Sequence, residues 1–209
     1  MKRIVPVLLG VFLLAACEKE PDTGRLSNSF LVYTDYDRAA DFGSFLTFYI
    51  PDSILLISGS KDAKYWDDVN ALRIIGTCVS NLESRGYVRV DEKELADLGV
   101  QLSYVEDTYY FTNYNNPYWW WDYPGYWYPG YWGNWGGWYY PYSVTYNYSV
   151  GSLLAELIDL DGEEGSTQKL PVIWDAYMTG LLSGSNRLNA SLAVEAVNQA
   201  FAQSPYLKN

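Results

Sequence analysis

Residues 65–85 read YWDDVNALRIIGTCVSNLESR and contain the clearest periodic pattern of the chain. Apolar residues recur there at steps of three and four, which places them along one side of a helix. This stripe consists of Trp66, Val69, Leu72, Ile75, Val79 and Leu82. Asp67 and Asp68 fall in the first turn, where acidic side chains favour the helix dipole, and Arg85-Gly86 is a typical stop. We therefore predict an amphipathic helix over these residues.

Runs with strand character lie on both sides of this helix. They are rich in β-branched and aromatic residues, and in residues 144–150 polar and apolar side chains alternate. We predict strands at 31–34, 45–50, 87–90, 100–105, 144–150, 153–160 and 172–182. Asp91 and Glu94 have capping-box spacing, which predicts a short helix ending at Leu98. A last helix is predicted at 192–202, with Val197 and Phe201 on one side.

These elements predict a fold of the α+β class. Two main helices on one face of a mixed or mostly antiparallel sheet are the simplest layered arrangement. A long, aromatic loop rich in glycine and proline interrupts the strands at residues 114–142. We predict that residues 29–209 form a single domain that contains this loop.

The N-terminus predicts a lipoprotein signal peptide over residues 1–16. Met1-Lys2-Arg3 is basic, and the apolar stretch from Ile4 is about thirteen residues long, too short for the roughly 20 that a membrane-spanning helix needs. It ends in Leu14-Ala15-Ala16-Cys17, which resembles bacterial lipoboxes. We predict cleavage before Cys17 and attachment of palmitate to that cysteine. Residues 17–28 then form a tether that holds the domain at the outer membrane, on its periplasmic face or at the cell surface.

The charge balance excludes several classes of partner. Loss of Lys2 and Arg3 with the signal peptide lowers the 14 basic residues to 12, against 25 acidic residues. Such a chain repels phosphate backbones and anionic lipid, so we predict no nucleic-acid partner. The membrane is reached through the lipid on Cys17 instead.

The residue inventory favours a protein that is not an enzyme. Histidine is absent, which removes the commonest general base and most zinc sites. Cys78 borders the apolar stripe of the helix, so we predict a buried, unpaired thiol. Two acidic groups, at Asp35–Asp41 and at Asp159–Glu164, lack the spacing of a calcium loop. We predict no catalytic residue, metal site or cofactor.

The aromatic segment, residues 114–142, contains seven of the nine tryptophans. Regularly placed proline and glycine residues forbid a helix or strand through most of it. The motif Pro-Gly-Tyr-Trp occurs at 124–127 and again at 129–132, which suggests two turns that present similar aromatic pairs. We predict that the candidate binding surface consists of Trp119, Trp120, Trp121, Tyr126, Trp127, Tyr131, Trp132, Trp135 and Trp138.

Three interpretations of this segment compete. It folds over the open face of the sheet as a core layer, because so much apolar ring area avoids water. Alternatively, it contacts an envelope protein or the membrane interface, since Trp and Tyr combine an apolar body with a polar tip. The third interpretation is a carbohydrate-binding surface, with rings stacked on sugars and with Asn113, Asn115, Asn116 and Asn134 as hydrogen-bonding groups. We favour a structural or partner-binding role, with a carbohydrate-binding module as the alternative.

Several short motifs occur in a consistent order along the mature chain. They are Val32-x-x-Asp35-x-Asp37, Asp41-Phe42-x-x-Phe45-x-Thr47-Phe48, Arg85-Gly86-Tyr87, Ala96-Asp97-Leu98-Gly99-Val100, Gly151-x-Leu153 with Asp159, and Val172-Ile173-Trp174. Their order and spacing resemble the envelope lipoproteins of the domain-of-unknown-function 4136 family, whose members often carry a Gly/Tyr/Trp-rich stretch. Members tend to have a basic residue and glycine after the late tryptophan, where this chain has Asp175-Ala176. The resemblance implies fold and location, and supplies no catalytic residues.

Overall fold

The computed structural model describes residues 30–58, 63–106, 132, 137–144, 149–162, 169–184 and 187–209. The predicted signal peptide, Cys17 and the predicted tether lie outside these residues. The described strands are β1 (Leu31–Tyr36), β2 (Thr47–Tyr49), β3 (Ile54–Ile57), β4 (Lys64–Trp66), β5 (Val88–Arg89), β6 (Leu98–Val105), β7 (Trp138–Tyr139), β8 (Leu153–Asp159) and β9 (Leu170–Thr179). The helices are α1 (Val69–Glu83) and α3 (Ala190–Gln203), with single 3-10 turns η2 (Phe42–Ser44) and η3 (Lys93–Leu95).

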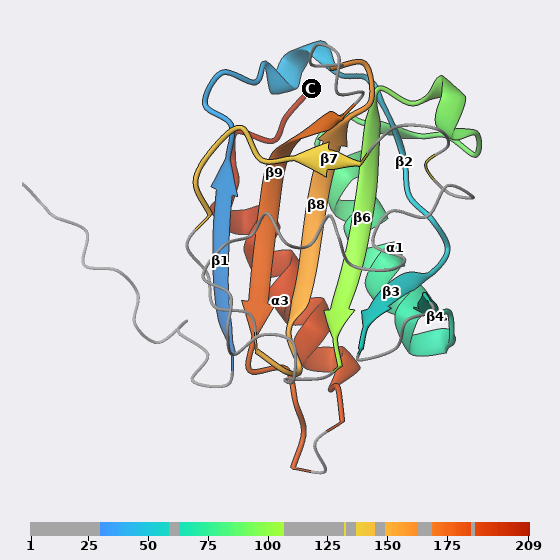
Figure 1. Cartoon of the computed structure of the whole chain (residues 1–209), viewed down its shortest axis with the longest axis vertical. Helices are drawn as coiled ribbons and strands as arrows, with labels where there is room; N and C mark the ends of the chain where they lie inside the picture. The colour runs from blue at the N-terminus through green and yellow to red at the C-terminus, as the bar shows by residue number, and fades with distance from the viewer. Residues whose placement is uncertain are drawn as a thin grey trace, which may run out of the picture.

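The strands form one mixed sheet in the order β1-β9-β8-β6-β2-β5 (Figure 1). The pairs β1–β9, β9–β8 and β8–β6 are antiparallel. On the other side of β6, β2 pairs with its first residues and β3 with its last ones, both in the parallel direction. The residues between β2 and β3 include Pro51, whose missing N–H explains why the partner of β6 is split in two.

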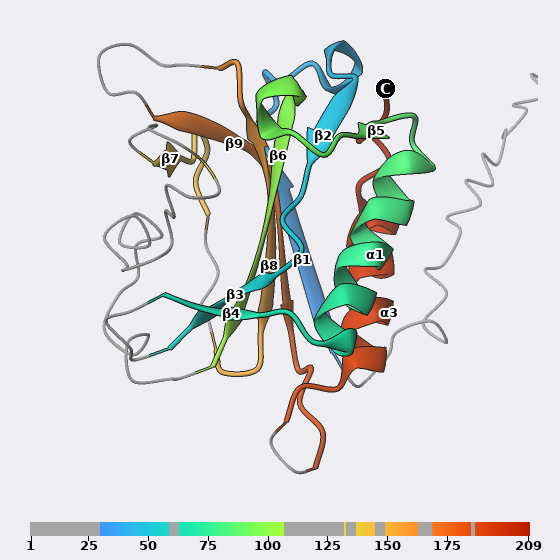
Figure 2. The ribbon, with the colours of Figure 1, turned by 90° about the vertical axis from the view of Figure 1, so that its right-hand side faces the viewer.

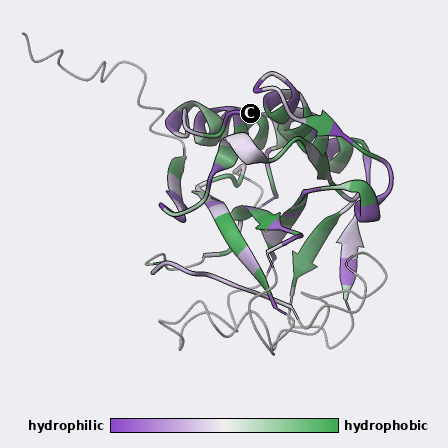
Figure 3. Ribbon diagram, turned by 90° about the horizontal axis from the view of Figure 1, so that it is seen from above, coloured by the Kyte–Doolittle hydropathy of each residue, from purple (hydrophilic) through white to green (hydrophobic). Residues whose placement is uncertain are grey.

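Two different layers cover the two faces of the sheet. Helices α1 and α3 lie behind it in Figure 1, and Figure 2 shows them together on one side with β7 on the other. Figure 3 shows hydrophobic residues along the central strands and both kinds of residue on the helices, as expected for amphipathic helices. The predicted α+β class, with two main helices on one face, is confirmed. Among the described residues, no helix has the length and apolar character needed to cross a bilayer.

Helix α1 begins directly after its N-cap residue, Asp68, whose side chain accepts hydrogen bonds from the backbone N–H groups of Asn70 and Ala71. It ends near Gly86, whose φ of 102° suits glycine, so the predicted stop is correct. The predicted stripe is partly wrong, because Val69 and Leu72 are 76% and 48% exposed and Trp66 belongs to β4. The buried side of the helix consists of Ala71, Ile74, Ile75, Cys78 and Leu82.

Side chains at the carboxyl end of α1 connect the two helices. Asn81 donates to the Asn198 side chain at 2.8 Å, and the Arg85 guanidinium donates to the Phe201 carbonyl at 2.8 Å while lying over the Phe201 ring. The Tyr87 hydroxyl donates to the Phe42 carbonyl at 3.0 Å, and burial raises its pKa to about 12. The Arg85-Gly86-Tyr87 motif therefore joins α1, α3 and η2.

Two further predictions need correction or lie outside the described residues, and some strands were not predicted. The helix predicted from Asp91 to Leu98 is only the turn η3, whose first residue receives no side-chain cap, and Leu98 already belongs to β6. Strands β3 and β4 were not predicted. Of the strand predicted at 144–150, residues 145–148 lie outside the described part, and the neighbouring positions are not in a strand.

The position of Cys78 generates a first test. Its side chain is buried in the helix-facing core, where desolvation raises the pKa of the thiol to about 12. In a shortened protein that begins at Glu18 and so lacks Cys17, we expect no reaction with a thiol reagent until the protein unfolds. Cys78→Ala should lower the free energy of unfolding by about 1 kcal/mol. Rapid labelling of the native domain would contradict this placement.

Candidate functional site

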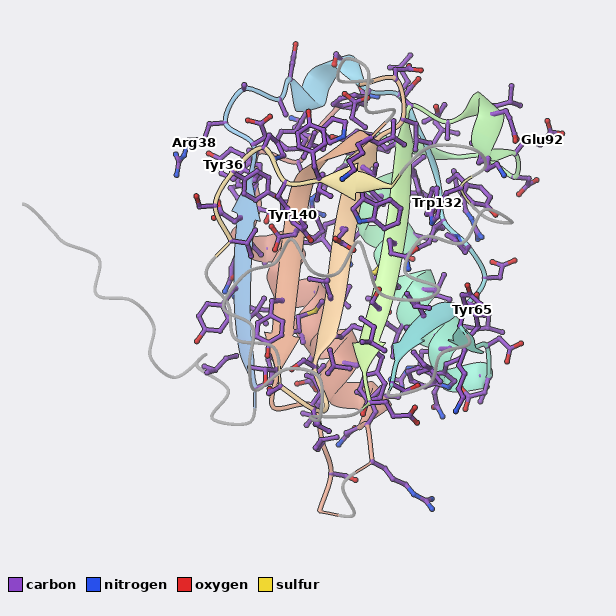
Figure 4. The ribbon with its side chains drawn as sticks, viewed as in Figure 1. Tyr36, Arg38, Tyr65, Glu92, Trp132 and Tyr140 are labelled. Atoms are coloured by element: carbon purple, nitrogen blue, oxygen red, sulfur yellow. The ribbon has the colours of Figure 1, made fainter. Side chains whose placement is uncertain are left out.

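The face of the sheet opposite the helices is covered by residues of the aromatic segment. We call Trp132, Trp138, Tyr140, Tyr142 and Val144 the aromatic layer. Trp132 and Trp138 are each 1% exposed, and their rings meet edge to face with centroids 5.7 Å apart. Figure 4 shows Trp132 and Tyr140 in front of the central strands, on the side away from the helices. Together with Ile158, Leu160, Leu170 and Val172, these residues form a second hydrophobic core.

Beneath this layer, three central strands contribute a row of polar residues. Gln101 of β6 lies directly opposite Glu156 of β8, and Glu156 lies opposite Asp175 of β9. Their neighbours along each strand point to the helices, so these three side chains point to the aromatic layer. Glu156 and Asp175 are 0% exposed. Such buried polar groups need hydrogen bonds to be tolerated.

Each member of this polar row accepts a hydrogen bond from an aromatic side chain. The Trp132 indole N–H donates to Gln101 Oε1 at 3.1 Å. The Tyr140 hydroxyl donates to Glu156 Oε1, and the Tyr142 hydroxyl donates to Asp175 Oδ1 at 2.8 Å. The polar tips of three rings thus fix the register of the aromatic layer on the sheet.

A glycine in β6 makes room for Trp132. A Cβ on Gly99 would lie 2.5 Å from Cζ3 of the Trp132 ring and 3.1 Å from Leu160. No real Cβ tolerates such a contact with a rigid ring, so the indole lies directly over the glycine backbone. The Ala96-Asp97-Leu98-Gly99-Val100 motif therefore includes the position against which one tryptophan of the aromatic layer packs.

The burial of Trp132 and Trp138 corrects part of the sequence prediction. We predicted both as members of an exposed binding surface, and both are core residues because their rings fill the space above β6 and β9. For these two, the core-layer interpretation is correct. The other predicted surface residues, Trp119, Trp120, Trp121, Tyr126, Trp127, Tyr131 and Trp135, lie outside the described residues.

A second cluster surrounds a cavity of about 500 Å³ at the amino-terminal end of β9. Five aspartates line it, and four of them come from the two acidic groups noted in the sequence. The five are Asp37, Asp41, Asp97, Asp159 and Asp161. Among the described residues, no group of acidic or cysteine side chains has an arrangement that could hold a metal ion.

Asp97 and Asp159 differ in electrostatic environment although both line this cavity. Burial opposes ionisation of Asp97, but the backbone N–H groups of Leu46 and Thr47, at 2.7 and 2.9 Å, outweigh it and lower its pKa. Burial raises the pKa of Asp159, against hydrogen bonds from the backbone of Asp161 and Gly162. Asp97 therefore joins the start of β6 to the start of β2, and has a structural role.

Comparison with known proteins places this geometry in a family. The sequence matches the family described as "Domain of unknown function (DUF4136)" over residues 32–206. The chain belongs to this family. A crystal structure of a DUF4136 family protein from Bacteroides thetaiotaomicron is 53% identical, covers 87% of this chain and 99% of its own, and has a TM-score of 0.79.

More distant similarity reaches PelC from Paraburkholderia phytofirmans, whose crystal structure is a dodecamer. It is 14% identical, with coverage of 86% of this chain and 99% of PelC and a TM-score of 0.41. No curated protein matches the sequence. The match over residues 32–206 and the 53% identical crystal structure confirm the resemblance to the DUF4136 family that the motifs predicted.

The packing of Trp132 on Gly99 predicts that substitutions of the two residues have coupled effects on stability. Gly99→Ala should lower the free energy of unfolding by about 1–3 kcal/mol, because the added methyl group overlaps the indole. Trp132→Ala should cost about 3–5 kcal/mol, and Gly99→Ala should cost much less in that background. The free energy of unfolding of the parent protein, the two single variants and the double variant is measured by chemical denaturation.

Gly184→Ala is the matched control for this double-mutant cycle, since its Cβ meets no atom within 4 Å. Additive effects of the Gly99 and Trp132 substitutions would show that the two residues do not contact each other.

The lowered pKa of Asp97 predicts that the stability of the protein depends on pH in the acidic range. Because its pKa is lowered from 3.8 in the folded protein, its contribution is present at neutral pH and is lost as the pH falls below about 3.8. Asp97→Asn should therefore lower the free energy of unfolding by about 1 kcal/mol at neutral pH. The difference from the parent protein should vanish in strong acid, as followed by denaturation at a series of pH values. A difference that is the same at every pH would contradict a role of the charge.

Proposed function

We propose that the protein is a lipid-anchored lipoprotein of the outer membrane that binds an envelope partner through its aromatic segment, without catalysing a reaction. The proposal combines the predicted lipid on Cys17 with the way in which the aromatic segment is attached to the sheet. One observation carries it: the start of β1 and the end of β6, after which the chain continues to the aromatic segment, lie at the same end of the sheet.

That relation follows from the pairing of the strands. Val32 of β1 pairs with Met178, Met178 with Leu153, and Leu153 with Tyr104 of β6. The start of β1 and the end of β6 therefore share one end of the sheet, and the figures show both at the lower end (Figure 1). Cys17 precedes Phe30 by 13 residues, a reach of at most about 45 Å for an extended chain. A lipid on Cys17 would thus keep the end of β6, from which the chain continues to the aromatic segment, close to the membrane.

The buried part of the aromatic segment supports a binding role for the remainder. Residues 107–131 connect Glu106, at the end of β6, with Trp132, which is fixed on Gly99 and Gln101. A segment attached to a rigid layer loses less conformational freedom when it binds. The proposed contact residues are those of the predicted surface that the core does not use: Trp119, Trp120, Trp121, Tyr126, Trp127, Tyr131 and Trp135.

The chemistry of the described residues supports a role without catalysis. The chain has no histidine, and the Cys78 thiol is buried with its pKa raised to about 12, which disfavours the reactive thiolate. The buried carboxylates Glu156 and Asp175 accept hydrogen bonds from Tyr140 and Tyr142 of the aromatic layer. These contacts serve the packing of that layer.

The lipid anchor is tested with the full chain expressed in a Gram-negative host. We expect incorporation of a palmitate analogue and recovery in the outer-membrane fraction. Cys17→Ala should abolish both and leave the precursor uncleaved, because processing depends on the lipid. Cys78→Ala is the matched control and should be labelled normally. Labelling that persists in the Cys17→Ala protein would refute the anchor.

The binding role is tested by comparing the two tryptophans of the repeat. Trp127→Ala should weaken binding by a few kcal/mol at most and leave the melting temperature unchanged. Trp132→Ala should lower the melting temperature, since Trp132 is buried. A photocrosslinking residue at position 127 should capture an envelope protein in cells. Binding of the mature domain to a glycan array, reduced by Trp127→Ala, would favour the carbohydrate-binding alternative. If neither crosslinking nor glycan binding is observed, the aromatic segment has no binding role and the proposal is wrong.

A further inference from the structure

The polar row beneath the aromatic layer contains two acidic side chains side by side. Glu156 and Asp175 are directly opposite each other on neighbouring antiparallel strands and project from the same face. Residues in such positions have Cβ atoms roughly 5 Å apart. Both side chains are fully buried, so water cannot screen one charge from the other.

The charged groups around this pair are acidic as well. Asp35 of β1 lies directly opposite Asp175 and continues the row to the edge of the sheet. The other members of the row and its flanks on this face are Gln101, Ser103 and Tyr177, and the covering residues are Tyr140 and Tyr142. None of these residues carries a positive charge.

The basic residue closest in sequence to this row is Arg38, three residues after Asp35, and its exposed guanidinium lies over the ring of Tyr36, which packs against the helix-facing core. No lysine, arginine or histidine occurs in residues 94–168, which include β6, β8 and the whole aromatic segment. Lys169 is six residues before Asp175, which corresponds to about 20 Å along a strand. Two ionised carboxylates at this place would therefore repel each other in a medium of low dielectric constant.

We infer that Glu156 and Asp175 together retain one proton at neutral pH and act as a latch that holds the aromatic layer on the sheet. With one proton the pair carries a single charge, which the hydroxyl groups of Tyr140 and Tyr142 stabilise by donating hydrogen bonds. When the proton leaves to solvent, two adjacent charges remain under the rings. Opening the layer hydrates both carboxylates, so deprotonation favours the open form.

The sign of the pH dependence follows from this arrangement. A pair that binds its proton more tightly when the layer is closed stabilises the closed form fully in acid and loses that stabilisation as the pH rises. Asp159, whose pKa is raised by burial, contributes with the same sign from the cavity at the end of β9. Asp97 contributes with the opposite sign, and only below about 3.8.

The proton is measured directly by infrared difference spectroscopy of the mature protein. At neutral pH we expect the carbonyl stretching band of a protonated carboxylic acid. Glu156→Gln and Asp175→Asn should each remove it, because a single neutral amide relieves the repulsion. Asp159→Asn is the matched control and should retain the band. If the parent protein lacks the band, or if both variants keep it, the inference is wrong.

The latch is measured by hydrogen exchange of residues 137–144, normalised to intrinsic exchange rates. Between mildly acidic pH and about pH 9, below the ionisation of tyrosine, protection should fall by up to tenfold per pH unit as long as the closed pair holds a proton that the open form has lost. In Glu156→Gln, which keeps an acceptor for Tyr140, the part of this fall that the pair causes should disappear, so protection should depend much less on pH over this range. The same fall in the parent protein and in both variants would overturn the latch. The parent spectrum decides the presence of the proton even if a variant fails to fold.

Discussion

The burial of β6 on both of its faces is the constraint on which the other parts of the structure depend. All eight residues from Leu98 to Val105 are buried. Leu98, Val100, Leu102 and Tyr104 face the helices, while Gly99, Gln101 and Val105 face the aromatic layer. A strand buried in this way needs two covering layers, because either face left open would expose its side chains to water. Helices α1 and α3 supply one layer, and the aromatic layer supplies the other.

Periodicity and capping predicted the helical side of the fold, and failed where long-range pairing decides the structure. The existence and stop of α1, the last helix and most strands follow from local patterns, whereas the predicted start of α1 at Tyr65 was wrong because residues 65–66 belong to β4. The burial of Val69 and Leu72 was wrongly predicted, because steps of three and four fit two neighbouring stripes and packing against the sheet and α3 selects the one with Ala71 and Ile74. Strand β4 was missed because its pairing with β3 is a contact between separate segments.

Composition identified the candidate site but not the orientation of its rings. Nothing in the repeated Pro-Gly-Tyr-Trp motif indicates that Trp132 turns inward. The signal was in the sheet: Gly99 among large residues, and Glu156 in an otherwise apolar strand, are positions where an outside group must fill space or satisfy a buried polar atom. Searching strands for such interruptions would have found the partners of the aromatic layer, though not which rings provide them.

The division of the strand beside β6 into β2 and β3 has a consequence for neighbouring molecules. Molecules tethered to a membrane share a thin shell of solvent, so encounters between their sheet edges are frequent. A long, regular edge offers consecutive backbone groups to a second chain and invites fibril-like growth. Here that side of the sheet presents strands of two to four residues, interrupted at Pro51. A crowded population anchored as proposed would therefore be protected from uncontrolled edge-to-edge assembly on this side.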